Sequence, residues 1–219
     1  MSYAIINYHY IRDRGDNGIH PCTIAEFRAQ VNELQKTATI VSPSELYKNA
    51  RANRPGRFVA FTFDDGLKEH YTVVFPFLHD LGIRGAFFPL ELPVARGIIP
   101  LAHKLHIILG KFSTVGLIER LEMFVGRAGH VPRDRAVNPA RRFDDLLSAN
   151  LKESLIALPY SDRSRFVDEL FRESAIDEQQ LARDFFLTHE EIRSLLAAGM
   201  EIGSNTSRHI ALDTLAPRE

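Results

Sequence analysis

The sequence lacks several features that would indicate a class of protein directly, namely multiple cysteines, long apolar runs, a signal peptide and a large net charge. Cys22 is the only cysteine among 219 residues, so neither a disulfide framework nor a cysteine-based metal site is expected. No apolar run approaches the roughly 18–20 residues of a transmembrane helix, and the N-terminus lacks the basic and apolar regions of a signal peptide. The formal net charge is -1, so no long-range field favours nucleic acid or an anionic membrane. We expect a cytoplasmic protein without a membrane span or a nucleic-acid partner.

Short apolar segments of strand character recur along the chain, separated by stretches with a helical pattern. Strands are expected at 4–9, 58–63, 84–89 and 200–204, with a briefer one at 39–41. Between 58 and 89 a strand, a helix and a second strand follow one another, which is typical of parallel strands joined by a crossover helix. Neither an internal repeat nor a low-complexity tract interrupts this order. The predicted fold class is therefore α/β.

Capping residues mark the starts of three expected helices. Thr23 and Thr188 each precede a glutamate by three positions, which is the spacing of a capping box, and Pro43 suits the first turn of a helix. The region 100–187 differs because it contains helical patterns and no strand. Its basic linker, 126–142, is rich in Gly and Pro, and a solvated loop is favoured there over an anion-binding site. The helices of this region are expected at roughly 101–109, 115–126, 146–157, 162–173 and 177–183.

Polar residues follow two of the predicted strands. The aromatic strand 58–63 runs directly into Asp64 and Asp65, two carboxylates that repel each other and are costly to desolvate. A metal ion, a proton transfer or a helix cap would each explain the pair. The segment from Asn205 to His209 follows the last predicted strand. In a parallel sheet both groups lie at the carboxyl ends of strands, where sites form, and carboxylate, amide and imidazole are donors for a divalent ion.

Two motifs carry a resemblance to a known family. Thr62–Gly66 (TFDDG) together with Asn205–His209 (NTSRH) resembles the polysaccharide deacetylases of the NodB-homology class. Segments that look like an intracellular branch of this family, which carries a helical insertion, are Asn7–Asp13, Phe61–Tyr71, His103–His106 and Glu201–Ser204. The resemblance spans nearly the whole chain. It implies an incomplete, distorted (β/α) barrel formed by residues 1–99 and 188–219, with a helical insertion at 100–187.

The resemblance also implies an activity, namely metal-dependent hydrolysis of the non-peptide C–N bond of an N-acetylated amino sugar or glycan, with release of acetate. By this resemblance Asp64 is the general base, and Asp65 and His209 are ligands of a divalent ion. Zinc is the expected ion, with cobalt or nickel as alternatives. Thr206 would orient the ligand-bearing loop from outside the coordination sphere. Gly66 would lie close to the substrate.

The chain departs from the family pattern in two ways. Asn205 stands where the second motif normally begins with a histidine, and a neutral amide oxygen is a weaker donor than imidazole, so metal affinity should be reduced. The family motifs that supply an arginine for the base and a late histidine as general acid would follow His209, but the chain ends at Glu219. We therefore expect a chain truncated after the second motif, with too few strands to close a barrel of roughly eight. Self-association through the exposed sheet edge is a further expectation.

Other histidines of the chain are candidates for the missing general acid. His9, at a strand end, is the best local candidate, and His70 is expected to line the pocket mouth; for His9 the alternative is a hydrogen-bonded core histidine. His103 and His106 share one helix face, but two ligands are too few for a second metal site. The alternative function is a catalytically impaired deacetylase-like protein that acts as a glycan-binding or assembly module. An unrelated aspartate-based phosphotransferase is disfavoured because we find no phosphate-binding loop.

Overall fold

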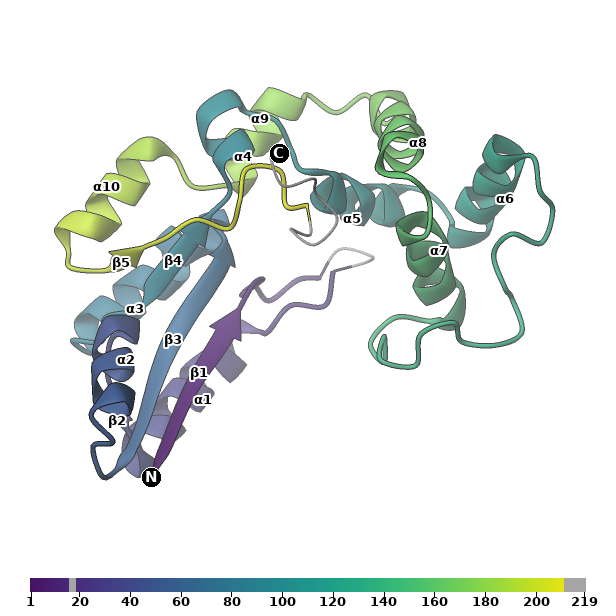
Figure 1. Cartoon of the computed structure of the whole chain (residues 1–219). Helices are drawn as coiled ribbons and strands as arrows, with labels where there is room; N and C mark the ends of the chain where they lie inside the picture. Colours follow the sequence, from purple (N-terminus) through teal and green to yellow (C-terminus); the bar gives the residue numbers. More distant parts are fainter. Residues whose placement is uncertain (16–18, 211–219) are drawn as a thin grey trace. The chain divides into compact units, whose positions relative to one another are not determined.

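The structure is a computed structural model of the chain, and it describes residues 1–15 and 19–210. The chain divides into two compact units (Figure 1). The first unit consists of Met1–Arg14, Pro21–Ile99 and Glu178–Glu219, and the second of Gly15–His20 and Pro100–Asp177. Residues 178–187, assigned above to the helical insertion, lie in the first unit.

The first unit is built on a parallel sheet. Its strands are β1 (Ser2–Tyr8), β2 (Thr39–Ile40), β3 (Arg57–Asp65), β4 (Ala86–Pro89) and β5 (Glu201–Ile202). The order is β1-β3-β4-β5, and β2 pairs with the first half of β3. The register places Asn7 opposite Thr62 and Asp64 opposite Phe88. Because all pairs are parallel, the carboxyl ends of the strands lie along one edge of the sheet.

Helices follow the strands of this unit. They are α1 (Ile24–Thr37), α2 (Pro43–Arg51), a π-helical turn η1 (His70–Val74), α3 (Phe75–Asp80), α4 (Glu91–Arg96), α9 (Glu178–Phe185) and α10 (His189–Ala197). Capping boxes begin α1, α2 and α10, at Thr23, Ser42 and Thr188, because in each the N-cap hydroxyl and the N3 glutamate bond to each other's backbone amides. The starts of these helices were predicted from Thr23, Pro43 and Thr188.

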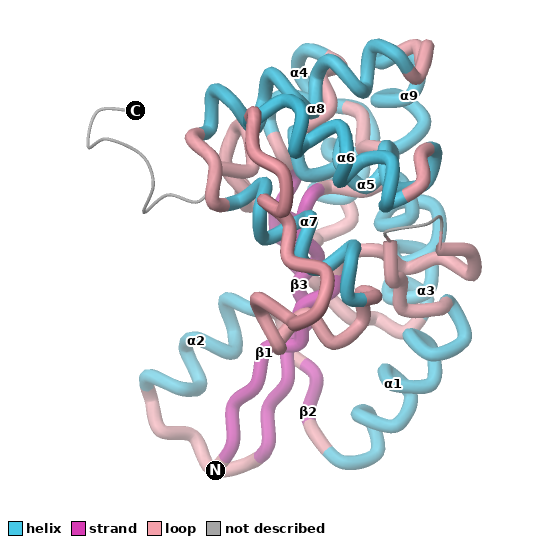
Figure 2. The backbone as a smooth tube through the Cα atoms, turned by 90° about the vertical axis from the view of Figure 1, so that its right-hand side faces the viewer, coloured by secondary structure: helices cyan, strands magenta, loops and turns pink. Residues whose placement is uncertain are grey.

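Alternating residues of β3 face two different layers. Val59, Phe61 and Phe63 belong to one buried cluster that includes residues of α1, α3 and α10. Phe58 and Ala60 belong to a second cluster, which contains Leu46 of α2. Figure 2 shows α1 and α2 on opposite sides of the strands. The two-residue period of a strand explains this division, and the packing on both faces holds the end of β3 in place.

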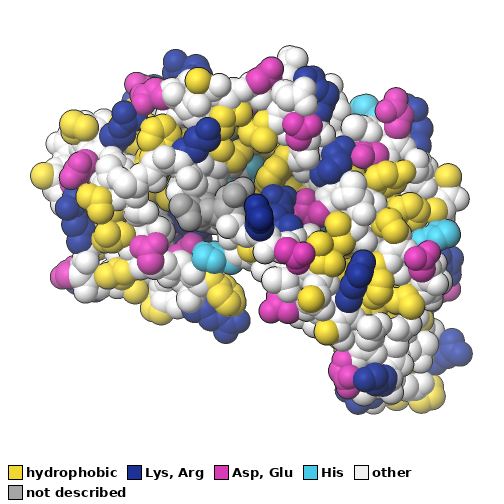
Figure 3. Space-filling view, turned by 180° about the vertical axis from the view of Figure 1, so that it is seen from behind, with side chains coloured by type: hydrophobic (Ala, Val, Ile, Leu, Met, Phe, Trp, Pro, Cys, Tyr) yellow, Lys and Arg dark blue, Asp and Glu magenta, His cyan; other side chains and the backbone are white. Residues whose placement is uncertain are grey.

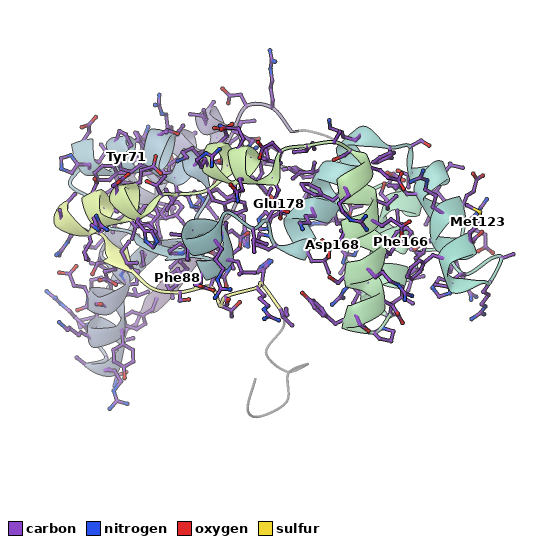
Figure 4. All side chains as sticks on the ribbon, turned by 90° about the horizontal axis from the view of Figure 1, so that it is seen from above. Tyr71, Phe88, Met123, Phe166, Asp168 and Glu178 are labelled. Carbon is purple, nitrogen blue, oxygen red and sulfur yellow. The ribbon has the colours of Figure 1, made fainter. Side chains whose placement is uncertain are left out.

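The second unit is helical where the structure describes it. Its helices are α5 (Leu101–Lys111), α6 (Thr114–Val125), α7 (Leu146–Ile156) and α8 (Tyr160–Glu173). Phe166 and Val167 of α8 are buried, and Lys104 Nζ of α5 donates to Asp168 Oδ1 of α8 at 2.8 Å. Figure 4 labels Phe166 and Asp168 on α8, and Met123, which is 73% exposed, on α6. Packing of α5 on α8 therefore combines an apolar core with a partly buried ion pair.

The structure differs from three of the predictions. The α/β class with a parallel sheet is confirmed, but the barrel is not, since the sheet formed by the described residues is not closed. Helix α4 was not predicted, because Pro89 and Pro93 mark its neighbourhood as irregular. β3 runs two residues further than expected and includes Asp64 and Asp65.

Two surface properties bear on the expected partners. Within residues 1–15 and 19–210, no helix is long and apolar enough to cross a membrane. On the face shown in Figure 3, Lys and Arg side chains are interspersed with Asp and Glu side chains, in keeping with a net charge of -1. The cytoplasmic location and the self-association through a sheet edge stay predictions.

Candidate active site

The end of β3 carries both aspartates. Asp64 and Asp65 pair with Phe88 and Pro89 of β4, yet the Asp64 side chain is 26% exposed and that of Asp65 only 3%. Gly66 follows with a φ of +64°, and a Cβ there would lie 2.6 Å from the Cβ of Pro89. Only glycine fits this close approach, so the turn out of β3 depends on it. The adjacent carboxylates therefore occupy different environments.

The Asp64 region, defined as Asn7, Thr62, Asp64 and His9, is built from paired strands. Asn7 Nδ2 donates to Asp64 Oδ2 at 2.9 Å, and Thr62 Oγ1 donates to Asn7 Oδ1 at 2.9 Å. Since the Thr62 hydroxyl donates to the amide oxygen of Asn7, the amide must present its NH₂ group to Asp64. His9 Nε2 lies 3.8 Å from Asp64 Oδ2, and the His9 side chain is 46% exposed. This carboxylate is oriented and close to solvent.

The Asp65 region, defined as Asp65, Asn205, Thr206 and His209, joins β3 to the segment after β5. Asn205 Nδ2 donates to Asp65 Oδ1 at 2.8 Å, and His209 Nε2 lies 3.4 Å from the same oxygen. The backbone N–H of His209 donates to Thr206 Oγ1 at 3.1 Å. Asp65, Thr206 and His209 all have positive φ, at 72°, 68° and 56°. Three non-glycine residues with positive φ therefore lie close to the buried carboxylate of Asp65.

Helix α4 supports the segment after β5 (Figure 1). The backbone N–H of Glu91 donates to the carbonyl of Thr206 at 3.3 Å, and that of Leu92 to the carbonyl of Ser207 at 3.2 Å. The Ser207 hydroxyl donates to the Glu91 carboxylate. The backbone N–H of Asn205 donates to the carbonyl of Pro89 at 3.1 Å. The first amides of α4 thus bond to the strained segment, and they were missed because the helix itself was missed.

His70 does not line a pocket mouth, as was predicted, but is buried next to Phe63 and the backbone of His9. It is 0% exposed, and its ring centroid is 5.5 Å from that of Phe63. Burial lowers the pKa of His70 to about 4, so the ring is neutral near pH 7. Its Nε2 lies 2.7 Å from the carbonyl of His9, which can only accept, so this nitrogen carries the proton. His70 therefore fixes the backbone of His9.

A group that sequence reasoning missed surrounds Tyr10. The guanidinium of Arg12 donates from Nη2 to Glu69 Oε1 at 2.7 Å, and it lies over the rings of Tyr10 and Phe185, at 5.1 and 4.7 Å from their centroids. Burial, followed by the negative charge of Asp65, raises the pKa of Tyr10. The phenol therefore stays protonated. Arg12 lies within the segment Asn7–Asp13, and a cation that packs over two aromatic rings gives no local sequence signal.

The donors around Asp65 suit a divalent ion in their chemistry. A carboxylate, an imidazole and an amide converge there, and all three occur as ligands of such ions. In the part of the chain that the structure describes, no group of three His, Cys, Asp or Glu residues converges as a metal site. Asn205, whose side-chain amide already contacts Asp65, is the candidate third protein donor for an ion held by Asp65 and His209. His103 and His106 lie on α5 with ring centroids 6.2 Å apart and form no such group.

Comparison with known proteins gives only distant likenesses. No family model and no curated protein matches the sequence. In structure, the chain is similar to the Streptococcus pyogenes deacetylase PplD in complex with acetate, at 16% identity and a TM-score of 0.39, covering 69% of this chain and 81% of that one. It is similar to IcaB from Ammonifex degensii at 19% identity and a TM-score of 0.38, covering 77% and 81%. A de-N-acetylase from Aggregatibacter actinomycetemcomitans shows 14% identity and a TM-score of 0.39, covering 97% of both chains.

Proposed function

We propose that this chain is a hydrolase that removes the N-acetyl group from an acetylated amino sugar or glycan. The observation that carries the proposal is the division of two adjacent carboxylates into different environments. Asp64 is 26% exposed and oriented by Asn7, whereas Asp65 is 3% exposed and contacted by Asn205 and His209. Hydrolysis of an amide needs one group that moves a proton and another that stabilises charge on the substrate. Two unlike carboxylates side by side suit these two roles.

Asp64 is the proposed general base. The hydrogen bond from Asn7 holds one carboxylate oxygen, and the partly exposed side chain can accept a proton from a water molecule. The Thr62 hydroxyl keeps the Asn7 amide in that orientation. As the C–N bond breaks, acetate forms and the amine leaves with a proton. His9, half exposed and 3.8 Å from Asp64, is the proposed donor of that proton.

Asp65 and His209 are the proposed ligands of zinc, or of cobalt or nickel, and Asn205 would bind through its amide oxygen. When bound, the ion would lower the pKa of water and polarise the amide carbonyl. Asn205 must first turn its NH₂ group away from Asp65, a rearrangement that a histidine ligand would not require. Thr206 accepts the backbone N–H of His209 and so orients the loop that carries it.

The same contact between Asn205 and Asp65 favours a second function. An NH₂ group that donates to Asp65 Oδ1 at 2.8 Å satisfies the buried carboxylate without a cation. A protein stabilised in this way needs no metal to fold its site. The second candidate is therefore a glycan-binding or assembly module on a deacetylase scaffold, without catalysis.

Release of acetate from N-acetylglucosamine oligomers separates the two functions. The purified chain is assayed with zinc, cobalt or nickel, and bound metal is quantified by mass spectrometry. We expect acetate release that falls by at least about a hundredfold in Asp64→Asn and that is unchanged in Asp80→Asn, a variant of an exposed aspartate on α3. Oligomer binding with neither acetate release nor near-stoichiometric metal would instead support the binding module.

A further inference from the structure

The second unit contains a pocket of its own, with a volume of about 430 Å³, and all of its lining residues belong to this unit. This is within the roughly 300–1,000 Å³ typical of ligand sites. Six polar side chains line it: His20, Ser113, Thr114, Asp144, Asp145 and Ser148. Leu109 and Phe112 add an apolar part to the wall. The pocket is thus mainly polar, with one apolar surface.

The charge of Asp144 in this wall is already compensated. Lys152 Nζ lies 2.6 Å from Asp144 Oδ1, and both side chains are 8% exposed. His20 Nε2 lies 3.3 Å from the same oxygen, and Arg141 contacts the other oxygen at 3.8 Å. An ion pair of this kind is costly to break, because removing one partner leaves the other charge buried. The negative charge of Asp144 is therefore balanced by its neighbours and is not available to neutralise a positively charged ligand.

The carboxylate and hydroxyl groups of the wall offer hydrogen-bond acceptors. Asp145 Oδ1 accepts the backbone N–H groups of Leu147 and Ser148 at 3.0 Å each and caps α7. A hydrogen bond from the Ser148 side chain lowers the pKa of Asp145, so this carboxylate stays ionised and can only accept. Thr114 Oγ1 and Ser148 Oγ lie 3.1 Å apart and share a hydrogen bond in which either hydroxyl can donate. The wall therefore presents carboxylate acceptors on Asp145 and hydroxyl groups that can also accept a hydrogen bond.

The polar groups of the pocket wall favour one class of ligand. A phosphate or other anion would meet the carboxylates of Asp144 and Asp145. Among the described residues no group of three His, Cys, Asp or Glu could hold a metal ion, and Lys152 already occupies Asp144. A sugar supplies hydroxyl donors for the acceptors and C–H groups that pack on Phe112. We infer that the pocket of the second unit binds a neutral, hydroxyl-rich ligand, namely a sugar residue. This goes beyond the proposed function, which concerns the first unit alone.

Binding of β-1,4-linked N-acetylglucosamine tetramer to the full chain tests the inference without any catalytic readout. The titration is followed by NMR of backbone amides and by calorimetry, with Asp64→Asn as the background so that the tetramer is not consumed. We expect saturable shifts at Thr114 and Ser148. Thr114→Val with Ser148→Ala should raise the Kd by about tenfold, the size expected for lost hydrogen bonds to the ligand. Thr37→Val, the same change on α1 of the first unit, should leave the Kd unchanged.

Two results would overturn the inference. One is a tetramer titration in which the amides of Thr114 and Ser148 do not shift; the other is a Kd that the double variant leaves unchanged. His20→Gln, a change at a side chain that is 49% exposed, provides a variant that puts the fold at less risk, and it should also weaken binding. Competition by inorganic phosphate would contradict the neutral class. Failure of deacetylation leaves these outcomes intact, because none of them depends on acetate release.

Discussion

The Asp64 region and the Asp65 region surround neighbouring residues, but they are built by different means. In the Asp64 region, the contacts follow from regular strand pairing, since Asn7 lies opposite Thr62 and both reach toward the end of β3. In the Asp65 region, three non-glycine residues have positive φ, and Thr206 is β-branched. Such a conformation costs about 1–3 kcal/mol for a β-branched residue such as Thr206 and less for Asp and His. The backbone around Thr206 is held by hydrogen bonds to α4 and Pro89.

Under the proposed function, the difference assigns proton transfer to the Asp64 region and metal binding to the Asp65 region. Strand pairing orients Asp64 without backbone strain, as a group that moves a proton requires. Positive φ values accompany the approach of Asn205 and His209 to one buried oxygen, as the proposed group of metal ligands requires. We therefore expect changes in the Asp64 region to affect turnover, and changes in the Asp65 region to affect metal affinity.

The largest effect is expected for Asp64→Asn. An amide is nearly the same size as the carboxylate but cannot accept a proton, so acetate release should fall by roughly 10²–10⁴-fold, the range for loss of a general base. Metal affinity, measured by competition with a chelating dye, should change little because Asp64 is not a proposed ligand. A parallel loss of metal would contradict the division between the two regions.

The second-largest expected effect is a loss of folding stability in acid, and its source is the buried His70. Burial lowers the pKa of His70 to about 4 from an ordinary value of 6.5. Between these values the unfolded chain binds the proton and the folded chain does not, so stability is fully present above pH 6.5 and is lost as the pH falls toward 4. The loss is about 3 kcal/mol. Urea unfolding between pH 7 and pH 4 measures it.

His70→Gln provides the comparison for this prediction. Gln keeps an NH donor for the carbonyl of His9 but does not titrate, so the variant should lose the part of the pH dependence that His70 contributes. His79→Gln, on the exposed side of α3, should retain the full dependence. The same acid dependence in wild type and His70→Gln would show that His70 is not its source.

Much of this architecture was predictable from local sequence. Hydroxyl residues three positions before a glutamate locate the starts of α1 and α10, because both groups bond to free amides. The convergence of Asp64 and Asp65 with the segment after β5 follows from parallel pairing, which brings strand ends together. In these cases the physical cause lies within a few residues or in a general rule of sheets.

Other features depend on contacts between distant segments and had no local signal. Asn7 meets Asp64 only because β1 and β3 pair in one particular register. The positive φ of Thr206 is imposed by bonds to α4, and no β-branched residue favours it by itself. His70 falls in a π-helical turn that buries its ring, whereas an ordinary helical count does not predict such a turn. Tertiary packing, not propensity, determined these positions.

Asn7→Ala should have a smaller effect that is confined to the Asp64 region. The variant removes the donor to Asp64 and leaves the Thr62 hydroxyl without its acceptor, at a cost of about 1–2 kcal/mol in orientation of the base. We expect kcat for acetate release to fall about tenfold, with little change in KM and none in metal affinity. Thr62→Val removes only the contact that orients Asn7 and should reduce kcat less. A change in KM alone would show that Asn7 contacts substrate instead of positioning Asp64.

Asn205→His tests the Asp65 region and should have an effect no larger than that of Asn7→Ala. The imidazole is a stronger donor than an amide, and the variant also removes the NH₂ group that donates to Asp65 Oδ1. We expect zinc affinity to rise about tenfold, or about 1.4 kcal/mol. Asn32→His on the exposed side of α1 is the matched control, since it adds a histidine without a neighbouring carboxylate site. Equal zinc occupancy in Asn205→His and wild type would mean that the third donor does not limit binding, and the weakness would then lie in the strained backbone that carries His209.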